Sequence, residues 1–138
     1  MPEKVTIFSE SAPAPIGPYA QGVKYDKMIY VSGQIPADPA TGKLVGRTAA
    51  EQTDRVLKNI MAVLQSTGAQ MSNIVKTTMF LVDLNDFKEV NEVYKNYFEF
   101  MPPARSTVQV SALPLGARVE IEAIAFLNPV EIKGGMML

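Results

Sequence analysis

The chain has 138 residues, the size of one domain, and contains no cysteine and no histidine. These absences exclude disulfides, thiolate nucleophiles, cysteine-bound metals, Ser-His-Asp triads and HExxH metal sites. The net charge is −1, from 13 basic and 14 acidic residues, so the chain lacks the overall charge signature of a polyanion-binding protein. An enzyme built from this chain must therefore use carboxylates, arginine, lysine, hydroxyls, backbone groups or bound water.

The sequence favours a single domain inside the cell. No segment approaches the roughly 20 consecutive apolar residues of a membrane span. The first residues, MPEKVTIF, lack the apolar core and cleavage site of a signal peptide. We therefore expect one domain over residues 1–138, no membrane association and a cytoplasmic location.

The first third of the chain predicts β structure, with candidate strands over residues 4–8, 22–25 and 28–32. The last two flank Asp26 and Lys27, which suit a tight hairpin connection. Residues 11–18 carry three of the ten prolines and are expected to form a fixed loop, because proline cannot enter a central strand. A surface loop is expected over residues 34–44.

A first helix is predicted to begin after Thr48. Thr48 and Glu51 have the spacing of a capping box, in which the hydroxyl and the carboxylate each satisfy a free backbone N–H. Apolar residues then recur at helical spacing, at Val56, Ile60, Val63 and Leu64. Gly68 is expected to end the helix.

A strand over residues 74–82 is followed by a second helix, with Asp83 or Asn85 as its cap. One broad apolar face is formed by Phe87, Val90, Val93, Tyr94, Tyr97 and Phe98. Pro102 and Pro103 are expected to end this helix, because proline cannot continue it.

Two final strands, over residues 104–112 and 118–127, complete the order βββαβαββ and an α+β class. Both helices are expected to cover the same face of one sheet. The other face then stays bare, with Thr77, Met79 and Leu81 or their alternates on it. Because that face is too apolar to meet water, we expect the chain to form an oligomer through it.

Arg105 and Glu120 are the first candidates for chemistry. Alternation places Arg105 with Thr107 on one face of its strand, and Glu120 with Arg118 on one face of the next. The apolar alternates in both strands are expected to pack beneath the helices. The arginine fork matches two carboxylate oxygens, and a glutamate near it can position water or move a proton. A structural ion pair at a subunit interface explains the same two residues, and this alternative stays open.

Four other residues are weaker candidates. Ser32 and Gly33 can offer a hydroxyl and a free N–H, Tyr19 a phenol on a rigid loop, and Asn91 an amide from the second helix. Each has a structural alternative. Ser32 and Gly33 can form a turn at a strand end, the Tyr19 ring can seal the core, and Asn91 can be a solvated helix position. The sequence contains no P-loop, GxGxxG or DxDxDG pattern, so its motifs do not support nucleotide or calcium binding.

The chain carries four separated motifs, which are IGPY with QG (residues 16–22), VSGQIP (31–36), IVKTTMFLVDLNDFKEVNEVY (74–94), and PARS (103–106) with EIEA (120–123). In this order they resemble the RidA family, also called YjgF or L-PSP. The likeness extends from about Ser11 to Leu127. It implies a chorismate-mutase-like fold, with a mixed six-stranded sheet and two helices on one face, and a homotrimer with clefts between its subunits.

The resemblance also implies an activity that needs no metal and no organic cofactor. Such enzymes hydrolyse reactive 2-imino acids, such as 2-iminobutanoate and 2-iminopropanoate, or their enamine tautomers, to 2-keto acids and ammonia. The substrates come from pyridoxal-phosphate enzymes. Carried over by motif, Arg105 holds the substrate carboxylate, and Glu120 positions the water and relays its proton. The pocket is lined by Tyr19, Ser32, Gly33, Asn91 and the backbone carbonyl of Thr107.

One position departs from the family. Many deaminating members have cysteine where this chain has Thr107. If only the backbone carbonyl contacts the water, activity is expected to survive, while the shape of the pocket and its substrate preference are open.

Two other functions remain alternatives. Some family members are described as endoribonucleases that inhibit translation, although this chain has neither histidine nor a basic stripe with interleaved aromatic residues. A trimer that binds a metabolite or acts as a chaperone without catalysis would use the same clefts, because Arg105 binds a keto acid equally well.

Overall fold

The computed structural model describes residues 2–128. These residues form a mixed sheet with the spatial order β1-β2-β3-β6-β4-β5, in which only β4 and β5 are parallel neighbours. The strands are β1 (Lys4–Ile7), β2 (Gly22–Tyr25), β3 (Met28–Gln34), β4 (Ile74–Leu81), β5 (Ala104–Gln109) and β6 (Val119–Phe126). A parallel pair needs a crossover connection, and a helix supplies it between β4 and β5. The predicted order βββαβαββ and the α+β class are confirmed.

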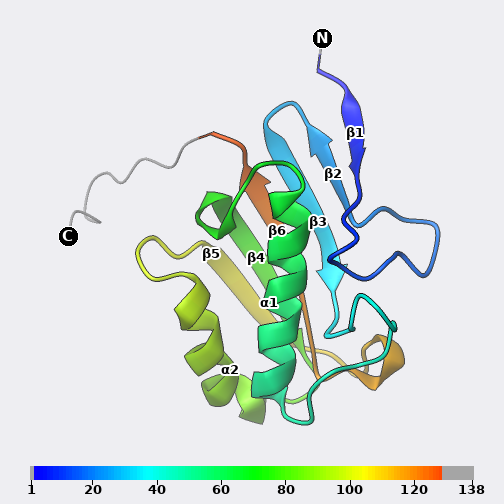
Figure 1. The fold of residues 1–138 in the computed structure, drawn as a ribbon. Helices are drawn as coiled ribbons and strands as arrows, with labels where there is room; N and C mark the ends of the chain where they lie inside the picture. Colours follow the sequence, from blue (N-terminus) through cyan, green and yellow to red (C-terminus); the bar gives the residue numbers. More distant parts are fainter. Residues whose placement is uncertain (1, 129–138) are drawn as a thin grey trace.

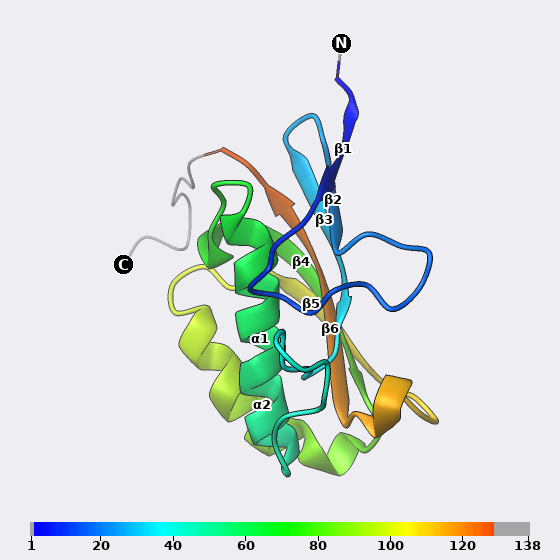
Figure 2. The same cartoon turned by 45° about the vertical axis from the view of Figure 1, so that its right-hand side comes forward.

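Both helices lie on the same face of the sheet, as predicted (Figures 1 and 2). Helix α1 (Ala49–Gln65) packs on β3 and β6, and α2 (Phe87–Tyr94) lies beside it. The capping box is present, because Thr48 Oγ1 accepts from the Glu51 N–H and Glu51 Oε1 accepts from the Thr48 N–H, each at 3.1 Å. Helix α1 ends three residues before Gly68, which turns the chain with a φ of +85°. The helices of the described part are too short or too polar to cross a bilayer.

The second helix is shorter than predicted. It ends at Tyr94, a 3₁₀ turn (Lys95–Tyr97) follows, and Phe98 leaves the helical region with φ −136°. The prediction that it continues to the two prolines is therefore wrong. Phe98 is buried, and its ring packs on that of Tyr94 with centroids 4.6 Å apart. Asp83 caps the preceding 3₁₀ turn (Leu84–Asp86), where it accepts from the Asn85 N–H at 2.9 Å.

The hydrophobic core lies between the helices and the sheet. Its fully buried members include Ile29, Leu57, Ile60, Leu64, Met79, Leu81 and Ile121. On β4 the side chains of Thr77, Met79 and Leu81 face this core, so their alternates, including Thr78 and Phe80, face the other way. The sequence left open whether Thr77, Met79 and Leu81 or the residues that alternate with them lie on the bare face. The structure places the alternating residues there.

Neither described helix covers the second face of the sheet. This face carries Tyr25, Tyr30 and Val108, whose exposed fractions are 50%, 46% and 43%. It also carries Glu120 and Glu122, which pair in register with Phe80 and Thr78. The surface is a mixture of aromatic, aliphatic and carboxylate side chains.

Strand β5 departs from the prediction for its two faces. Arg105 pairs in register with the fully buried Thr77, so the side with Arg105 and Thr107 faces the helices. The apolar Val108 points to the bare face instead. The expectation that apolar alternates lie beneath the helices is therefore confirmed for β6 but wrong for β5. Strand β5 is at the edge of the sheet, where the rings of α2 accommodate a long polar side chain.

Candidate active site

The candidate residues form two separate groups. The first, which we call the arginine cluster, surrounds Arg105 and consists of Phe87, Asn91, Tyr94, Arg105 and Thr107. The second, which we call the glutamate cluster, consists of Tyr19, Ser32, Gly33 and Glu120. Arg105 and Glu120 point to opposite faces of the sheet.

Two aromatic rings of α2 hold the guanidinium of Arg105. Its central carbon lies 4.7 Å from the ring centroid of Tyr94 and 5.3 Å from that of Phe87. Both distances are within the range of cation–π attraction. The guanidinium forms no ion pair within residues 2–128, and its planar fork matches a planar acceptor such as a carboxylate.

Asn91 belongs to the same cluster. It follows Phe87 by four residues and precedes Tyr94 by three, so all three side chains lie on one side of α2. Among the described residues, Asn91 Oδ1 is buried and accepts no hydrogen bond. Buried polar atoms are almost always paired, so an unpaired acceptor on the side of α2 that carries Phe87 and Tyr94 indicates a place for a ligand donor. The solvated helix position considered from sequence does not describe this oxygen.

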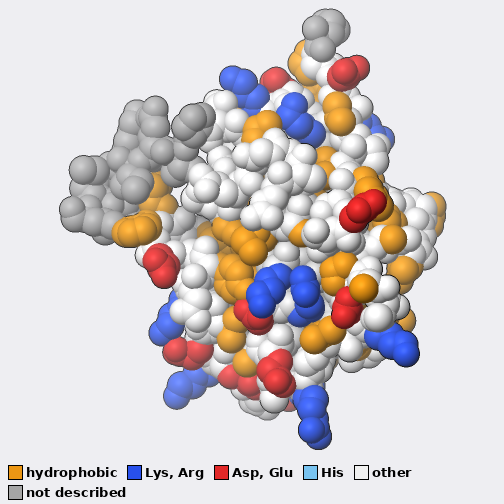
Figure 3. Space-filling view, in the orientation of Figure 1, with side chains coloured by type: hydrophobic (Ala, Val, Ile, Leu, Met, Phe, Trp, Pro, Cys, Tyr) orange, Lys and Arg blue, Asp and Glu red, His pale blue; other side chains and the backbone are white. Residues whose placement is uncertain are grey.

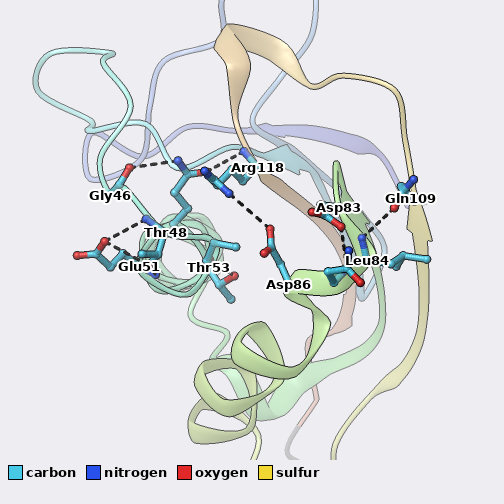
Figure 4. Close-up of polar contacts among 12 residues, drawn as sticks. Gly46, Thr48, Glu51, Thr53, Asp83, Leu84, Asp86, Gln109 and Arg118 are labelled. Atoms are coloured by element: carbon cyan, nitrogen blue, oxygen red, sulfur yellow. Dashed lines mark hydrogen bonds and ion pairs between the residues drawn. The ribbon is translucent and has the colours of Figure 1, made fainter.

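Thr107 lies two residues beyond Arg105 on the same face of β5. Gln109, the next residue on this face, accepts from the Leu84 N–H at 2.8 Å (Figure 4). This bond fixes the end of β5 to the turn that leads into α2. The strand and helix of the arginine cluster are therefore joined near their shared end.

A second set of contacts joins the starts of α2 and β6 (Figure 4). The Arg118 backbone N–H donates to Gln52 Oε1 at 2.8 Å, and Gln52 Nε2 donates to the Gly46 carbonyl at 3.2 Å. The Arg118 guanidinium lies 3.7 Å from Asp86 Oδ2, at the residue before α2. Since β6 carries Glu120, these contacts set the two clusters in a fixed relation.

Glu120 packs against the backbone at Gly33. The register of β3 and β6 shifts between Val31 and Gln34, so Ser32 and Gly33 fall in an irregular part of the ladder. Ser32 Oγ donates to the Ala20 carbonyl at 2.6 Å, which leaves its lone pairs for a ligand. Burial raises the pKa of the Glu120 carboxyl, and the negative charge of Glu122 raises it further. A carboxyl of raised pKa is suited to taking up and releasing a proton.

Replacement of Gly33 by alanine should impair catalysis more than folding. A Cβ at this position would overlap Glu120 Oε2 and lie 2.9 Å from the carboxylate carbon. The carboxylate ends a flexible side chain and can move away, so we expect a melting temperature near wild type and a large fall in kcat. Gly17→Ala is the control, because its Cβ would meet only the Tyr19 ring at 3.5 Å. Wild-type kcat in Gly33→Ala would show that the position of Glu120 is unimportant.

Tyr19 stands on the proline-rich loop and is 48% exposed. With Gly33 and Leu115 it lines a cleft of about 310 Å³. Its hydroxyl accepts from the Ile16 N–H at 3.3 Å. Tyr19 therefore lines a cleft, and the alternative of a ring that seals the core does not describe it.

The loop before Tyr19 is held by one buried side chain, Gln21, which is 1% exposed. Its Oε1 accepts from the Ser9 N–H at 2.6 Å, and its Nε2 lies within 3.2 Å of the carbonyl oxygens of Ser9, Ala12 and Pro13. Gln21→Leu leaves these backbone groups without partners and should lower the free energy of unfolding by about 2 kcal/mol or more. Urea denaturation measures this, with the exposed Gln65→Leu as control. Equal stability of the two variants would contradict the assigned role.

One chain cannot bring Arg105 and Glu120 to one small ligand. Their strands are separated by β4, which places them about 10 Å apart across the sheet, since neighbouring strands are about 4.8 Å apart. Their side chains also leave the sheet on opposite faces. Within residues 2–128, Arg105 forms no ion pair. An ion pair between Arg105 and Glu120 inside one chain is thus excluded.

Sequence reasoning missed three residues that support the candidate site. Phe87 and Tyr94 entered as members of an apolar helix face and of a longer motif, and Gln21 as part of a motif, but none of the three was given a role at the site. The seven-residue spacing of Phe87 and Tyr94 places them on one side of a helix, but only the register of β4 and β5 brings Arg105 to that side.

The charges of the described residues suit a small ligand. Acidic and basic side chains are interspersed over the helix-covered face, with no stripe of one sign (Figure 3). No group of three potential metal ligands comes together within residues 2–128. The chemistry available at the two clusters is therefore a cationic clamp, amide and hydroxyl groups, and one carboxyl of raised pKa.

Comparison with known proteins gives a consistent set of relatives. The family model described as endoribonuclease L-PSP matches residues 9–127. The chain is 50% identical to a mouse 2-iminobutanoate/2-iminopropanoate deaminase, covering 89% of this chain and 91% of the mouse protein. It is 49% identical to the chloroplastic Reactive Intermediate Deaminase A of Arabidopsis thaliana, covering 91% of this chain and 67% of the plant protein.

Solved structures agree with these relatives. A Rid-family protein from Yersinia pestis, YyfA, superposes with a TM-score of 0.87 and 50% identity, covering 90% of this chain and 99% of that protein. Escherichia coli TdcF, solved with bound serine, superposes with a TM-score of 0.85 and 42% identity, covering 88% of this chain and 98% of TdcF.

Proposed function

The chain belongs to the endoribonuclease L-PSP family, also called RidA or YjgF, and from this premise we propose that it is a 2-iminobutanoate/2-iminopropanoate deaminase. It hydrolyses reactive imines and their enamine tautomers to 2-keto acids and ammonia. The observation that carries the proposal is the guanidinium of Arg105, which lies over the rings of Phe87 and Tyr94 on the side of α2 that also carries the unpaired Asn91 oxygen. TdcF, with its bound serine, shows that a relative of this fold takes a ligand with a carboxylate.

The reaction needs little from the protein because an imine carbon is already electrophilic. Water adds to the C=N carbon while the nitrogen gains a proton, which gives a tetrahedral carbinolamine. The C–N bond of the carbinolamine then breaks, the hydroxyl loses its proton, and the products are a 2-keto acid and ammonia. No oxidant, metal or nucleophilic side chain is consumed, which agrees with a chain that has no cysteine and no histidine.

Two residues would supply the main functions. Arg105 binds the substrate carboxylate with its planar fork and so fixes the imine carbon. Glu120 accepts a proton from the attacking water and returns it to the leaving nitrogen, a task that its raised pKa favours. Asn91 Oδ1 accepts from the substrate nitrogen, and the backbone carbonyl of Thr107 orients the water. The remaining walls come from Tyr19, Ser32 and Gly33.

The complete site would form between two copies of the chain in a homotrimer. This arrangement is supported by the opposite directions of Arg105 and Glu120 in one chain and by the mixed apolar character of the bare sheet face. Each copy would give its arginine cluster to one site and its glutamate cluster to the next. Symmetric closure then makes every site equivalent.

An RNA-cleaving function is less well supported, although it is in the family description. Cleavage through a 2′-hydroxyl needs a base and an acid around the same phosphate, and RNA binding favours a basic surface. The chain has no histidine and a net charge of −1, and its charges are interspersed in Figure 3.

A coupled assay tests the proposal. A pyridoxal-phosphate threonine dehydratase generates the imine in the presence and absence of the protein, and the appearance of 2-ketobutyrate and the lifetime of the imine are followed. We expect the protein to shorten the imine lifetime in proportion to its concentration. Binding of 2-ketobutyrate without any change in imine lifetime would show a binding protein and contradict the enzymatic proposal.

A further inference from the structure

A buried hydrogen bond lies directly behind the arginine. Tyr94 is 6% exposed and Thr77 is fully buried, and their hydroxyl oxygens are 2.7 Å apart. Thr77 is also the residue of β4 that pairs in register with Arg105 on β5. Tyr94, Thr77 and Arg105 therefore link one helix and two strands at a single point.

The Tyr94 ring is fixed from both ends. Its hydroxyl is bonded to Thr77, and its ring packs against Phe98 with an interplanar angle of 40°. Arg105 lies over this ring at 4.7 Å. A free arginine side chain has large rotamer freedom, and a ring that cannot move gives its guanidinium one preferred plane.

The Tyr94 hydroxyl is suited to positioning and not to proton transfer. Burial raises the pKa of Tyr94, while the Thr77 hydrogen bond and the positive charge of Arg105 act in the opposite direction with smaller effect. The net direction is upward from a value near 10, so the hydroxyl stays protonated at physiological pH. A neutral phenol in this place contributes geometry.

We propose that the Thr77–Tyr94 pair is a positioning device that sets the plane of the Arg105 guanidinium, with Phe87 as a second ring in contact with it, so that the fork is ready to receive the substrate carboxylate. The inference rests on the proposed function in its choice of substrate, but the device itself is a property of the free protein. Preorganisation of this kind lowers the cost of binding.

Tyr94→Phe and Thr77→Val are the test variants, because each removes the hydroxyl pair and keeps the bulk of the side chain. We expect the Kd for 2-ketobutyrate and the KM for the imine to rise about fivefold to twentyfold, with kcat changed much less, since an interaction made equally in ground and transition states affects KM. The matched control is Tyr97→Phe. Tyr97 bonds Asp54 of α1, so its loss should alter stability without altering KM.

A double-mutant cycle separates positioning from a general structural effect. The ammonium group of lysine is not planar, so Tyr94 cannot orient it as it orients a guanidinium. In an Arg105→Lys background, Tyr94→Phe should therefore no longer weaken 2-ketobutyrate binding. The same fold-change in both backgrounds, or a wild-type Kd in Tyr94→Phe, would overturn the inference.

A ligand-free measurement keeps this test independent of catalysis. The Nε–H signal of Arg105, assigned by its disappearance in Arg105→Lys, should be shifted by the ring currents of the two aromatic rings and protected from exchange with water. Tyr94→Phe should speed its exchange and move it toward the position of free arginine, whereas an unchanged signal would overturn the inference. If the wild-type protein hydrolyses no imine but this signal responds as expected, the proposed function fails and the positioning inference stands.

Discussion

Arg105→Ala is expected to abolish imine hydrolysis at physiological substrate concentrations. The variant would lose the proposed bidentate contact to the substrate carboxylate and leave that charge unpaired, which should raise the free energy of the bound transition state by about 2 to 4 kcal/mol. This corresponds to a fall in kcat/KM of about 30-fold to 1,000-fold. The coupled dehydratase assay measures the fall, and titration with 2-ketobutyrate measures the matching loss of affinity.

The fold and assembly should survive this change, because within residues 2–128 Arg105 forms no ion pair and its ring contacts are with α2 of its own chain. Light scattering and thermal melting check both. Arg105→Lys is the matched control. It keeps the charge but loses the planar fork, so its kcat/KM should lie between those of Arg105→Ala and wild type. A wild-type rate in Arg105→Ala would exclude this residue from the site.

Glu120→Gln is expected to lower kcat by about 100-fold to 10,000-fold, the range of a lost general acid–base group. Affinity for 2-ketobutyrate should change little, since in the proposed site the carboxylate of that ligand binds Arg105 and not Glu120. The wild-type enzyme should lose activity on acidification at a pH above the ordinary glutamate value, because burial and Glu122 raise the pKa of Glu120. The rate that remains in Glu120→Gln should lack this acidic limb.

The raised pKa of Glu120 also predicts how stability depends on pH. In the window between the ordinary pKa and the raised one, the folded state binds more protons than the unfolded state, so stability falls as pH rises through it. Glu120→Gln removes this ionisation cost and should be at least as stable as wild type at neutral pH. A marked destabilisation there would show that the ionised carboxylate has a favourable structural partner.

Glu122→Gln is the control for these effects. Glu122 lies two residues along the same face of β6, and its charge is a secondary cause of the raised pKa of Glu120. The variant should retain most activity and shift the acidic limb to lower pH. A loss of activity equal to that of Glu120→Gln would assign catalysis to the pair rather than to Glu120.

Local chemical signals predicted some elements well and others poorly. Thr48 and Glu51 mark a helix start because the capping box depends on four neighbouring residues only. The end of α2 was mispredicted because Tyr97 and Phe98 continue its apolar spacing, although the chain has already entered a 3₁₀ turn at Lys95–Tyr97 and leaves the helical region at Phe98. A proline downstream sets only an outer limit for a helix.

The two faces of β5 show a second limit. Alternation separates Arg105 and Thr107 from Ser106 and Val108, but it does not say which set faces the helices. Apolar side chains are usually expected to face the helices. In the edge strand β5 the polar Arg105 faces them instead, in contact with the Tyr94 ring, and the apolar Val108 lies on the bare face.

The candidate site was predictable residue by residue but not as an assembly. Arg105, Glu120 and Asn91 stand in recognisable motifs, whereas the contact of Arg105 with Tyr94 depends on strand register and helix placement. The separation of Arg105 from Glu120 likewise appears only when the order of β5, β4 and β6 is known.

In the proposed assembly each active site takes Arg105 from one copy and Glu120 from another. The direct test is to unfold and refold Arg105→Ala and Glu120→Gln together in equal amounts, with native mass spectrometry to verify mixed assemblies. In a cyclic assembly, roughly a quarter of the sites should then carry both native residues, so activity should return to roughly a quarter of wild type. Mixed assemblies as inactive as each variant alone would contradict the claim.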